Sequence, residues 1–156
     1  LICTLPKIRT CVGRRIPGKM DVVDAPKRSQ MMAGIRSKNT KPEITVRKFL
    51  HSNGFRYSLH SKSLPGSPDI VLRKYNVAVF IHGCFWHRHD GCKYATIPSS
   101  NIERWESKFR QNTERDRRNI ASLRLLGWKT IVVWECELRA QASKRLKTLM
   151  AEILAS

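Results

Sequence analysis

The pattern of hydrophobic and polar residues predicts a single α/β domain. Short segments rich in β-branched and aromatic residues, bounded by turn residues, favour strands at residues 55–59, 69–72, 77–82 and 128–134. Apolar residues three or four positions apart favour helices over residues 41–53, 102–126 and from about 137 onwards. Residues 26–41 predict a short basic helix or arm leading into the domain. The order α-β-β-β-α-β-α predicts a mixed sheet flanked by helices.

The first long helix has a clear start signal. Thr40 followed three residues later by Glu43 is typical of a capping box, and Gly54 ends the pattern. Glu43 should lie on the same side as the apolar residues Val46 and Leu50. Its carboxylate therefore either caps the helix only or also serves a site on the core side.

The charge of the chain favours a polyanionic partner. The 156 residues carry a net charge of +18, and five of the positive charges lie in the acid-free residues 1–19, which leaves +13 for residues 20–156. A basic folded body favours nucleic acid over a charged tail alone. No apolar run approaches the roughly 20 residues of a membrane span.

Residues 1–19 are expected to be an upstream extension without a part in the fold. They contain no continuous apolar segment of the signal-peptide type, and Met20 begins a segment that resembles a natural start. Residues 20–156 are then one domain. Three cysteines of this domain lie among histidines, which favours a metal site in a reducing cytoplasm over disulfides.

These soft ligands have a spacing that can bind one Zn²⁺. Cys84, His89 and Cys92 follow a predicted strand, and Cys136 directly follows another strand, so neighbouring strand ends can bring them together. Four filled positions would make such a site structural. The alternative is three ordinary cysteines, with Cys136 simply buried. In either case His82 and His87 are not needed as metal ligands, so they make additional contacts or take part in catalysis.

Two further acids are candidates for chemistry. Asp69 follows Pro68 at the start of a strand, as in the core of restriction-type nucleases, although an aspartate in that place is also a common turn residue. The Glu-x-Lys pair of those nucleases is absent. Asp116 shares an apolar stripe with Ile120 and Leu123. A carboxylate directed inward near a histidine can orient and polarise a general base.

Longer motifs add a specific resemblance. They comprise Arg28-Ser29 with Met32, Pro65-Gly66-Ser67-Pro68-Asp69, Phe80-Ile81-His82-Gly83-Cys84-Phe85-Trp86-His87, Trp105, Glu114-Arg115-Asp116-Arg117-Arg118, Leu126-Gly127-Trp128 and Val133-Trp134-Glu135-Cys136. With these residues the chain resembles the very short patch repair endonucleases, bacterial enzymes that nick DNA at T:G mismatches left by deamination of 5-methylcytosine. The resemblance covers about residues 20–140. It implies a restriction-endonuclease-like α/β fold with a structural zinc.

The resemblance also implies roles for individual residues. Zinc would be bound by Cys84, His89, Cys92 and Cys136. Mg²⁺ would be bound by Asp69 and the backbone carbonyl of Ile81, and His87 with Asp116 would form the general base. His82 would contact the scissile phosphate, and Glu43 would assist. DNA contacts are implied for Phe85, Trp86, Trp105, Met32, Arg28 and Lys108. The family loop has one residue fewer before the second cysteine, where Asp90-Gly91 stand here.

The partner implied is double-stranded DNA with a T:G mismatch, and other mismatch-repair proteins are further candidates. A monomer suits the nicking of one strand at an asymmetric lesion. Phe85 and Trp86 are adjacent in a polar loop, so both cannot easily be buried, and aromatic side chains there can stack on bases. Two other functions fit the residues: a restriction-type endonuclease on intact sites, and a non-catalytic zinc module that binds DNA.

Overall fold

The structure, a computed structural model, describes residues 25–34 and 38–155. In chain order the elements are α1 (Ala25–Ala33), α2 (Lys41–Ser52), β1 (Ser58–Leu59), β2 (Ile70–Leu72), the 3₁₀ turn η1 (Arg73–Tyr75), β3 (Val77–His82), α3 (Ile102–Leu125), β4 (Lys129–Trp134) and α4 (Glu135–Leu154). The predicted mixed α/β architecture is confirmed. Within the described residues, no helix has the length and apolar character needed to cross a bilayer.

The four strands form one mixed sheet in the order β1-β2-β3-β4. The first three strands are antiparallel neighbours, and β4 runs parallel to β3 after the crossover through α3. The parallel register pairs His82 with Trp134. The last residues of the two central strands therefore lie side by side at one end of the sheet.

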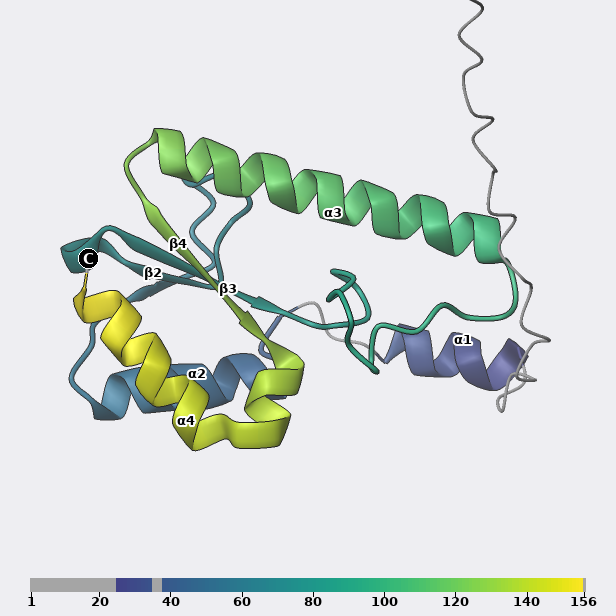
Figure 1. Cartoon of the computed structure of the whole chain (residues 1–156), viewed down its shortest axis with the longest axis horizontal. Helices are drawn as coiled ribbons and strands as arrows, with labels where there is room; N and C mark the ends of the chain where they lie inside the picture. Colours follow the sequence, from purple (N-terminus) through teal and green to yellow (C-terminus); the bar gives the residue numbers. More distant parts are fainter. Residues whose placement is uncertain (1–24, 35–37, 156) are drawn as a thin grey trace, which may run out of the picture.

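Helices cover both faces of this sheet (Figure 1). On one face, α2 and α4 bury a core that includes Val46, Val79, Val133 and Leu149. On the other face, α3 packs on a smaller cluster centred on Ala78, Phe80 and Leu123. Side chains alternate between the two faces along a strand, so His82 continues the series of Ala78 and Phe80 on the α3 face.

The start of α2 agrees with its sequence signal. Thr40 is the N-cap, and the capping box with Glu43 is present. The Glu43 carboxylate accepts a hydrogen bond from the Thr40 hydroxyl at 2.8 Å and is itself buried. The helix therefore holds this carboxylate on its inner side, as its position in the apolar stripe predicts.

Two segments differ from the sequence prediction. The strand expected at residues 55–59 contains only Ser58 and Leu59, because Phe55 packs in the core and its backbone N–H still donates to the Leu50 carbonyl at the end of α2. The last helix begins at Glu135, directly after β4, so Cys136 lies in its first turn. The expectation for residues 1–19 lies outside the described residues.

Candidate active site

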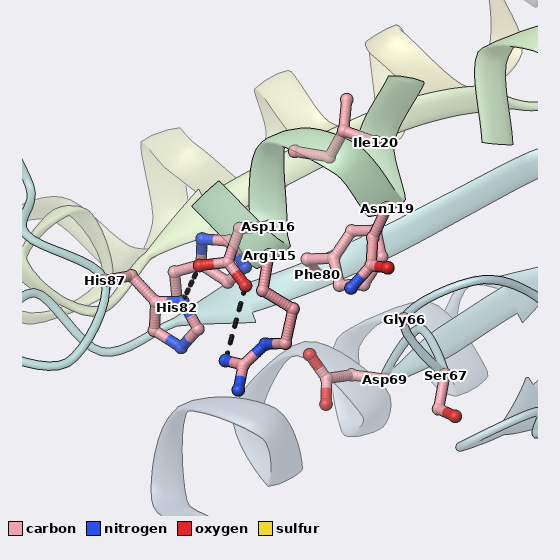
Figure 2. A pocket seen from close by; sticks show the side chains of 10 residues that line it. All are labelled: Gly66, Ser67, Asp69, Phe80, His82, His87, Arg115, Asp116, Asn119 and Ile120. Atoms are coloured by element: carbon pink, nitrogen blue, oxygen red, sulfur yellow. Dashed lines mark hydrogen bonds and ion pairs between the residues drawn. The ribbon is translucent and has the colours of Figure 1, made fainter. Parts of the chain in front are cut away.

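A cavity of about 170 Å³ opens where the α3 face of the sheet meets the loop before β2 (Figure 2). Its lining comes from separate parts of the chain: Gly66, Ser67, Asp69, Phe80, His82, His87, Arg115, Asp116, Asn119 and Ile120. Four of the five residues expected to be catalytic line this one cavity. Gly66 allows a close approach of the loop to α3, since a Cβ there would lie 2.8 Å from the Asn119 amide nitrogen.

His87 and Asp116 form a hydrogen-bonded pair in this cavity. The Nδ1 atom of His87 lies 2.5 Å from Oδ2 of Asp116 (Figure 2). Burial on its own would raise the pKa of Asp116, but the hydrogen bond and the charge of His87 outweigh burial and lower that pKa. Asp116 is therefore an ionised acceptor, and the proton of a neutral His87 lies on Nδ1. The Nε2 atom of His87 is left as a potential proton acceptor.

His82 stacks directly on His87. Their ring centroids are 3.8 Å apart and the rings are nearly parallel. Burial, and after it the neighbouring His87, lower the pKa of His82 to about 3. His82 is consequently neutral at physiological pH and acts through hydrogen bonding, without a positive charge.

Asp69 is held at the beginning of β2 by the next strand. Its Oδ2 atom accepts a hydrogen bond of 2.7 Å from the backbone N–H of Ile81. Burial raises the pKa of Asp69, and the nearby charge of Glu43 adds to this effect against the hydrogen bond from Ile81. Asp69 is thus a partly buried carboxylate beside a second acid, an arrangement that a bound cation would relieve.

Two residues that the sequence analysis missed complete the surroundings of Asp69. His60, from the segment before β2, forms a group of potential metal-binding side chains with Glu43 and Asp69. Arg47 forms an ion pair with Glu43 at 2.5 Å and contacts the His60 ring. Arg47 is four residues after Glu43, a spacing that predicts an ion pair on a helix, whereas His60 belongs to no motif or periodic pattern.

The four expected zinc ligands lie together in the structure. One donor atom from each of Cys84, His89, Cys92 and Cys136 falls within 4.8 Å of the other three. The Nδ1 atom of His89 is 3.2 Å from the Cys136 sulfur. Burial raises the pKa of the Cys84 and Cys136 thiols, whereas backbone hydrogen bonds lower the pKa of Cys92. Among the described residues, this donor set has the sulfur and nitrogen chemistry that Zn²⁺ prefers.

Trp134 connects the two groups of residues. Its ring stacks on His89 with a centroid distance of 4.1 Å and an interplanar angle of 3°. The same ring meets His82 edge to face at 5.3 Å. Trp134 lies in the strand that the sequence predicts at residues 128–134, but its side chain is only partly buried because β4 ends over the cysteine cluster.

The three aromatic residues expected at the DNA form one cluster. Phe85 packs edge to face on Trp86 and on Trp105, with centroid distances of 5.1 and 5.4 Å. Phe109, which is buried, supports them from α3. All three predicted residues remain half-buried: Phe85 and Trp86 lie in the loop after β3, and Trp105 lies in the first turn of α3. The Asn112 amide donates to the Trp86 carbonyl and fixes this part of the loop to α3.

The remaining expected DNA contacts are described only in part. Lys108 is an exposed residue of α3, one position before Phe109. The side chains of Arg28 and Met32 lie outside the described part of the structure.

Comparisons with known proteins identify the family of the chain. The family of the DNA mismatch endonuclease Vsr matches residues 20–93. A type II nicking enzyme of Neisseria meningitidis is 50% identical over 135 residues, which cover 85% of this chain and 96% of the relative. A type II nicking enzyme of Xanthomonas oryzae is 47% identical over 76% of this chain and 86% of the relative. The DNA mismatch endonuclease Vsr of Escherichia coli is 40% identical over 78% of this chain and 77% of the relative. The chain therefore belongs to the Vsr family of DNA mismatch endonucleases.

Proposed function

We propose that this endonuclease nicks duplex DNA 5′ of the thymine in T:G mismatches that arise from deamination of 5-methylcytosine. The proposal includes a Mg²⁺ ion held at Asp69, a structural Zn²⁺ at the cysteine cluster, and a restriction-endonuclease-like fold. The observation that carries it is the single cavity in which Asp69, His87 and Asp116 meet. These residues come from the start of β2, the loop after β3 and the middle of α3.

Asp69 and the backbone carbonyl of Ile81 would hold the magnesium ion. The hydrogen bond from the Ile81 N–H keeps the carboxylate beside that part of β3. The fit rests on donor chemistry, since carboxylate oxygens of Asp69 and Glu43 lie within 4.8 Å of each other and Mg²⁺ prefers oxygen ligands. When bound, Mg²⁺ supplies Lewis-acid stabilisation of the charge that develops on the phosphate.

His87 would act as the general base. Its Nδ1–H is donated to Asp116, so Nε2 can take a proton from the water that attacks phosphorus. Asp116 stabilises the imidazolium that results, as an ionised carboxylate does for a catalytic histidine. His82, which is neutral because it is buried, can orient a phosphate oxygen or a water molecule by a hydrogen bond. Glu43 assists through the charge that it adds beside Asp69.

The cysteine cluster would hold zinc in a purely structural role. Its four donors would fill the four positions that a structural zinc ion usually takes and would leave none open. Cys84, His89 and Cys92 belong to residues 83–101, and Cys136 belongs to α4. A metal ion there would fasten the loop that carries His87 and the aromatic cluster to the rest of the fold.

The aromatic cluster would select the mismatch. Separating stacked bases costs a few kcal/mol, least at a mispair, and each aromatic–base stack returns about 1–3 kcal/mol. The three aromatic side chains of Phe85, Trp86 and Trp105 form one half-buried group, and Trp86 directly precedes His87 in the chain. Three stacks could hold open a T:G step and leave a fully paired duplex closed.

Strand-specific cleavage of labelled duplexes tests the function. The panel contains T:G, T:A and C:G pairs in several sequence contexts, with Mg²⁺ or with a chelator. The proposal predicts Mg²⁺-dependent nicking of the thymine strand in the T:G duplexes only. Equal cleavage of paired sites would favour a restriction-type endonuclease, and binding without cleavage would favour a non-catalytic module.

A further inference from the structure

His60 lies between the Asp69 carboxylate and a buried ion pair. Its Nε2 atom is 3.0 Å from the Nη2 atom of Arg47, and its Nδ1 atom is 3.8 Å from Oδ1 of Asp69. Arg47 is nine-tenths buried and holds Glu43 with the same Nη2 atom. The imidazole therefore spans the gap between the Arg47–Glu43 pair and the carboxylate at the start of β2.

The contact with Arg47 determines where the proton of His60 lies. A guanidinium group has donors only, so the His60 nitrogen that it contacts must be an acceptor. A proton on Nε2 would place two N–H donors against each other at 3.0 Å. The single proton of the ring is consequently on Nδ1, the atom that faces Asp69.

Both oxygens of Asp69 then face an N–H group. Oδ2 accepts from the backbone of Ile81 at 2.7 Å, and Oδ1 faces the Nδ1–H of His60. The backbone N–H of His60 also donates to the Asp69 carbonyl at 3.4 Å. His60 adopts a left-handed backbone conformation (φ of 45°), which is uncommon for a residue other than glycine and requires support from its surroundings.

We propose that His60 is a positioning residue: Arg47 holds it in the Nδ1–H tautomer, and His60 orients the Asp69 carboxylate. This inference rests on the proposed function, in which Asp69 binds the catalytic cation. The competing arrangement is a cation bound jointly by Glu43, His60 and Asp69. That arrangement needs a free lone pair on a ring nitrogen of His60, whereas in the proposed tautomer Nε2 accepts from Arg47 and Nδ1 carries the proton.

The tautomer can be measured in the unaltered protein. Long-range ¹H–¹⁵N correlation spectra of the full chain, labelled at its five histidines, distinguish Nδ1–H, Nε2–H and doubly protonated rings. The spectrum of His60→Asn identifies the His60 signals by their loss. We expect the Nδ1–H pattern. An Nε2–H or doubly protonated ring would overturn the proposal.

Two substitutions separate the two ring nitrogens. The amide nitrogen of His60→Asn reproduces the Nδ1–H position, and that of His60→Gln reproduces the Nε2 position. Because partners of metal-binding residues typically contribute about 10- to 100-fold to metal affinity or activity, His60→Gln should weaken Mn²⁺ binding and slow single-turnover nicking by about that factor. His60→Asn should recover most of both. His51→Asn, on the exposed last turn of α2, is the matched control.

Mn²⁺ binding is read from the electron paramagnetic resonance signal of the unbound ion, and DNA affinity is measured without divalent cations. Equal loss of Mn²⁺ binding in both His60 variants would indicate a direct ligand and overturn the proposal, as would wild-type behaviour of His60→Gln. If His60→Gln does not fold, the tautomer measured in the unaltered protein is the deciding test of the proposal. Asp69→Asn distinguishes failure of the proposed function from failure of the role of His60. Full activity of Asp69→Asn would contradict the proposed function. An inactive Asp69→Asn together with an unaffected His60→Gln would contradict only the role of His60.

Discussion

The contact between His87 and Asp116 determines which nitrogen of the histidine is available for chemistry. With Nδ1 donated to the carboxylate, Nε2 is the basic atom in the cavity. An asparagine at position 116 removes the negative charge that both orients and stabilises the imidazolium. Asp116→Asn should therefore lower the single-turnover nicking rate by about 10²–10⁴-fold, the usual contribution of general-base catalysis.

The control for this substitution is Glu114→Gln, which removes an equal charge from an exposed position on the same helix. Both variants reduce the repulsion of DNA similarly, so a difference between them reports on the catalytic pair. A rate for Asp116→Asn within threefold of the control would contradict the role of His87 as the base.

Burial of His82 should make the stability of the fold depend on pH. Its pKa falls from an ordinary value of 6.5 to about 3 in the folded protein, so the unfolded chain binds more protons between these values. Stability from this residue is complete above about pH 6.5 and decreases as the pH falls towards 3. The thermal midpoint should fall more between pH 7 and 5 in the wild type than in His82→Asn. Parallel curves would show that His82 titrates normally.

At the scale of elements, α3 connects the proposed catalytic pair to the aromatic cluster. Asp116 and Phe109 are seven residues apart on this helix and lie on its inner side, one at His87 and the other beneath the aromatic cluster. The Asn112 amide, between them, holds the Trp86 carbonyl. The helix therefore fixes the distance between the cutting centre and the aromatic residues that would contact the bases.

Trp86→Ala tests recognition separately from catalysis. Loss of one base stack worth about 1–3 kcal/mol should reduce the preference for T:G over T:A duplexes by roughly 10- to 100-fold. The fold should persist because Trp86 is only half-buried. Tyr94→Ala, an exposed aromatic of the same loop, serves as the control and should keep the preference. Competition binding with both duplexes measures the ratio, and an unchanged ratio in Trp86→Ala would refute the wedge.

The elements and the residues on them differ in how far the sequence predicts them. The period of 3.6 residues is sufficient to predict that Asp116 points inward, and the capping box predicts the start of α2, because both signals are local. His60 carries no such signal, and the spacing of Arg47 four residues after Glu43 predicts only an ion pair within the helix. Their importance arises only when α2 and the segment before β2 meet at Asp69, a long-range contact that no local pattern encodes.

The same limit of local patterns applies to Trp134. A β-branched and aromatic run predicts a buried strand, and Ile131 and Val133 are indeed buried on the α2 and α4 side. The sequence does not reveal that the strand ends over residues 83–101. Trp134 therefore lies between His82 and His89 instead of inside the core.

At the scale of the whole molecule, the cysteine cluster brings the loop of residues 83–101 together with α4. This segment has no helix or strand of its own, and its Cys84 and Cys92 lie near Cys136 of α4. We expect one zinc ion per chain by elemental analysis. Removal with a strong chelator should lower the thermal midpoint and open the loop to proteolysis, and Zn²⁺ but not Mg²⁺ should restore both. A protein without zinc and with unchanged stability after chelation would contradict the structural role.

The strongly basic body explains why a small enzyme can engage duplex DNA, but charge does not select a cleavage site. In the proposed function, one phosphodiester is cut in the cavity between the sheet and α3. The central claim of the proposed function is that Asp69 holds the catalytic cation. It is tested most directly by the single-turnover nicking rate of Asp69→Asn on a T:G duplex at saturating Mg²⁺, with DNA affinity measured in parallel. We predict unchanged binding and a rate at or near the limit of detection. Nicking by Asp69→Asn at the wild-type rate would contradict the proposed active site.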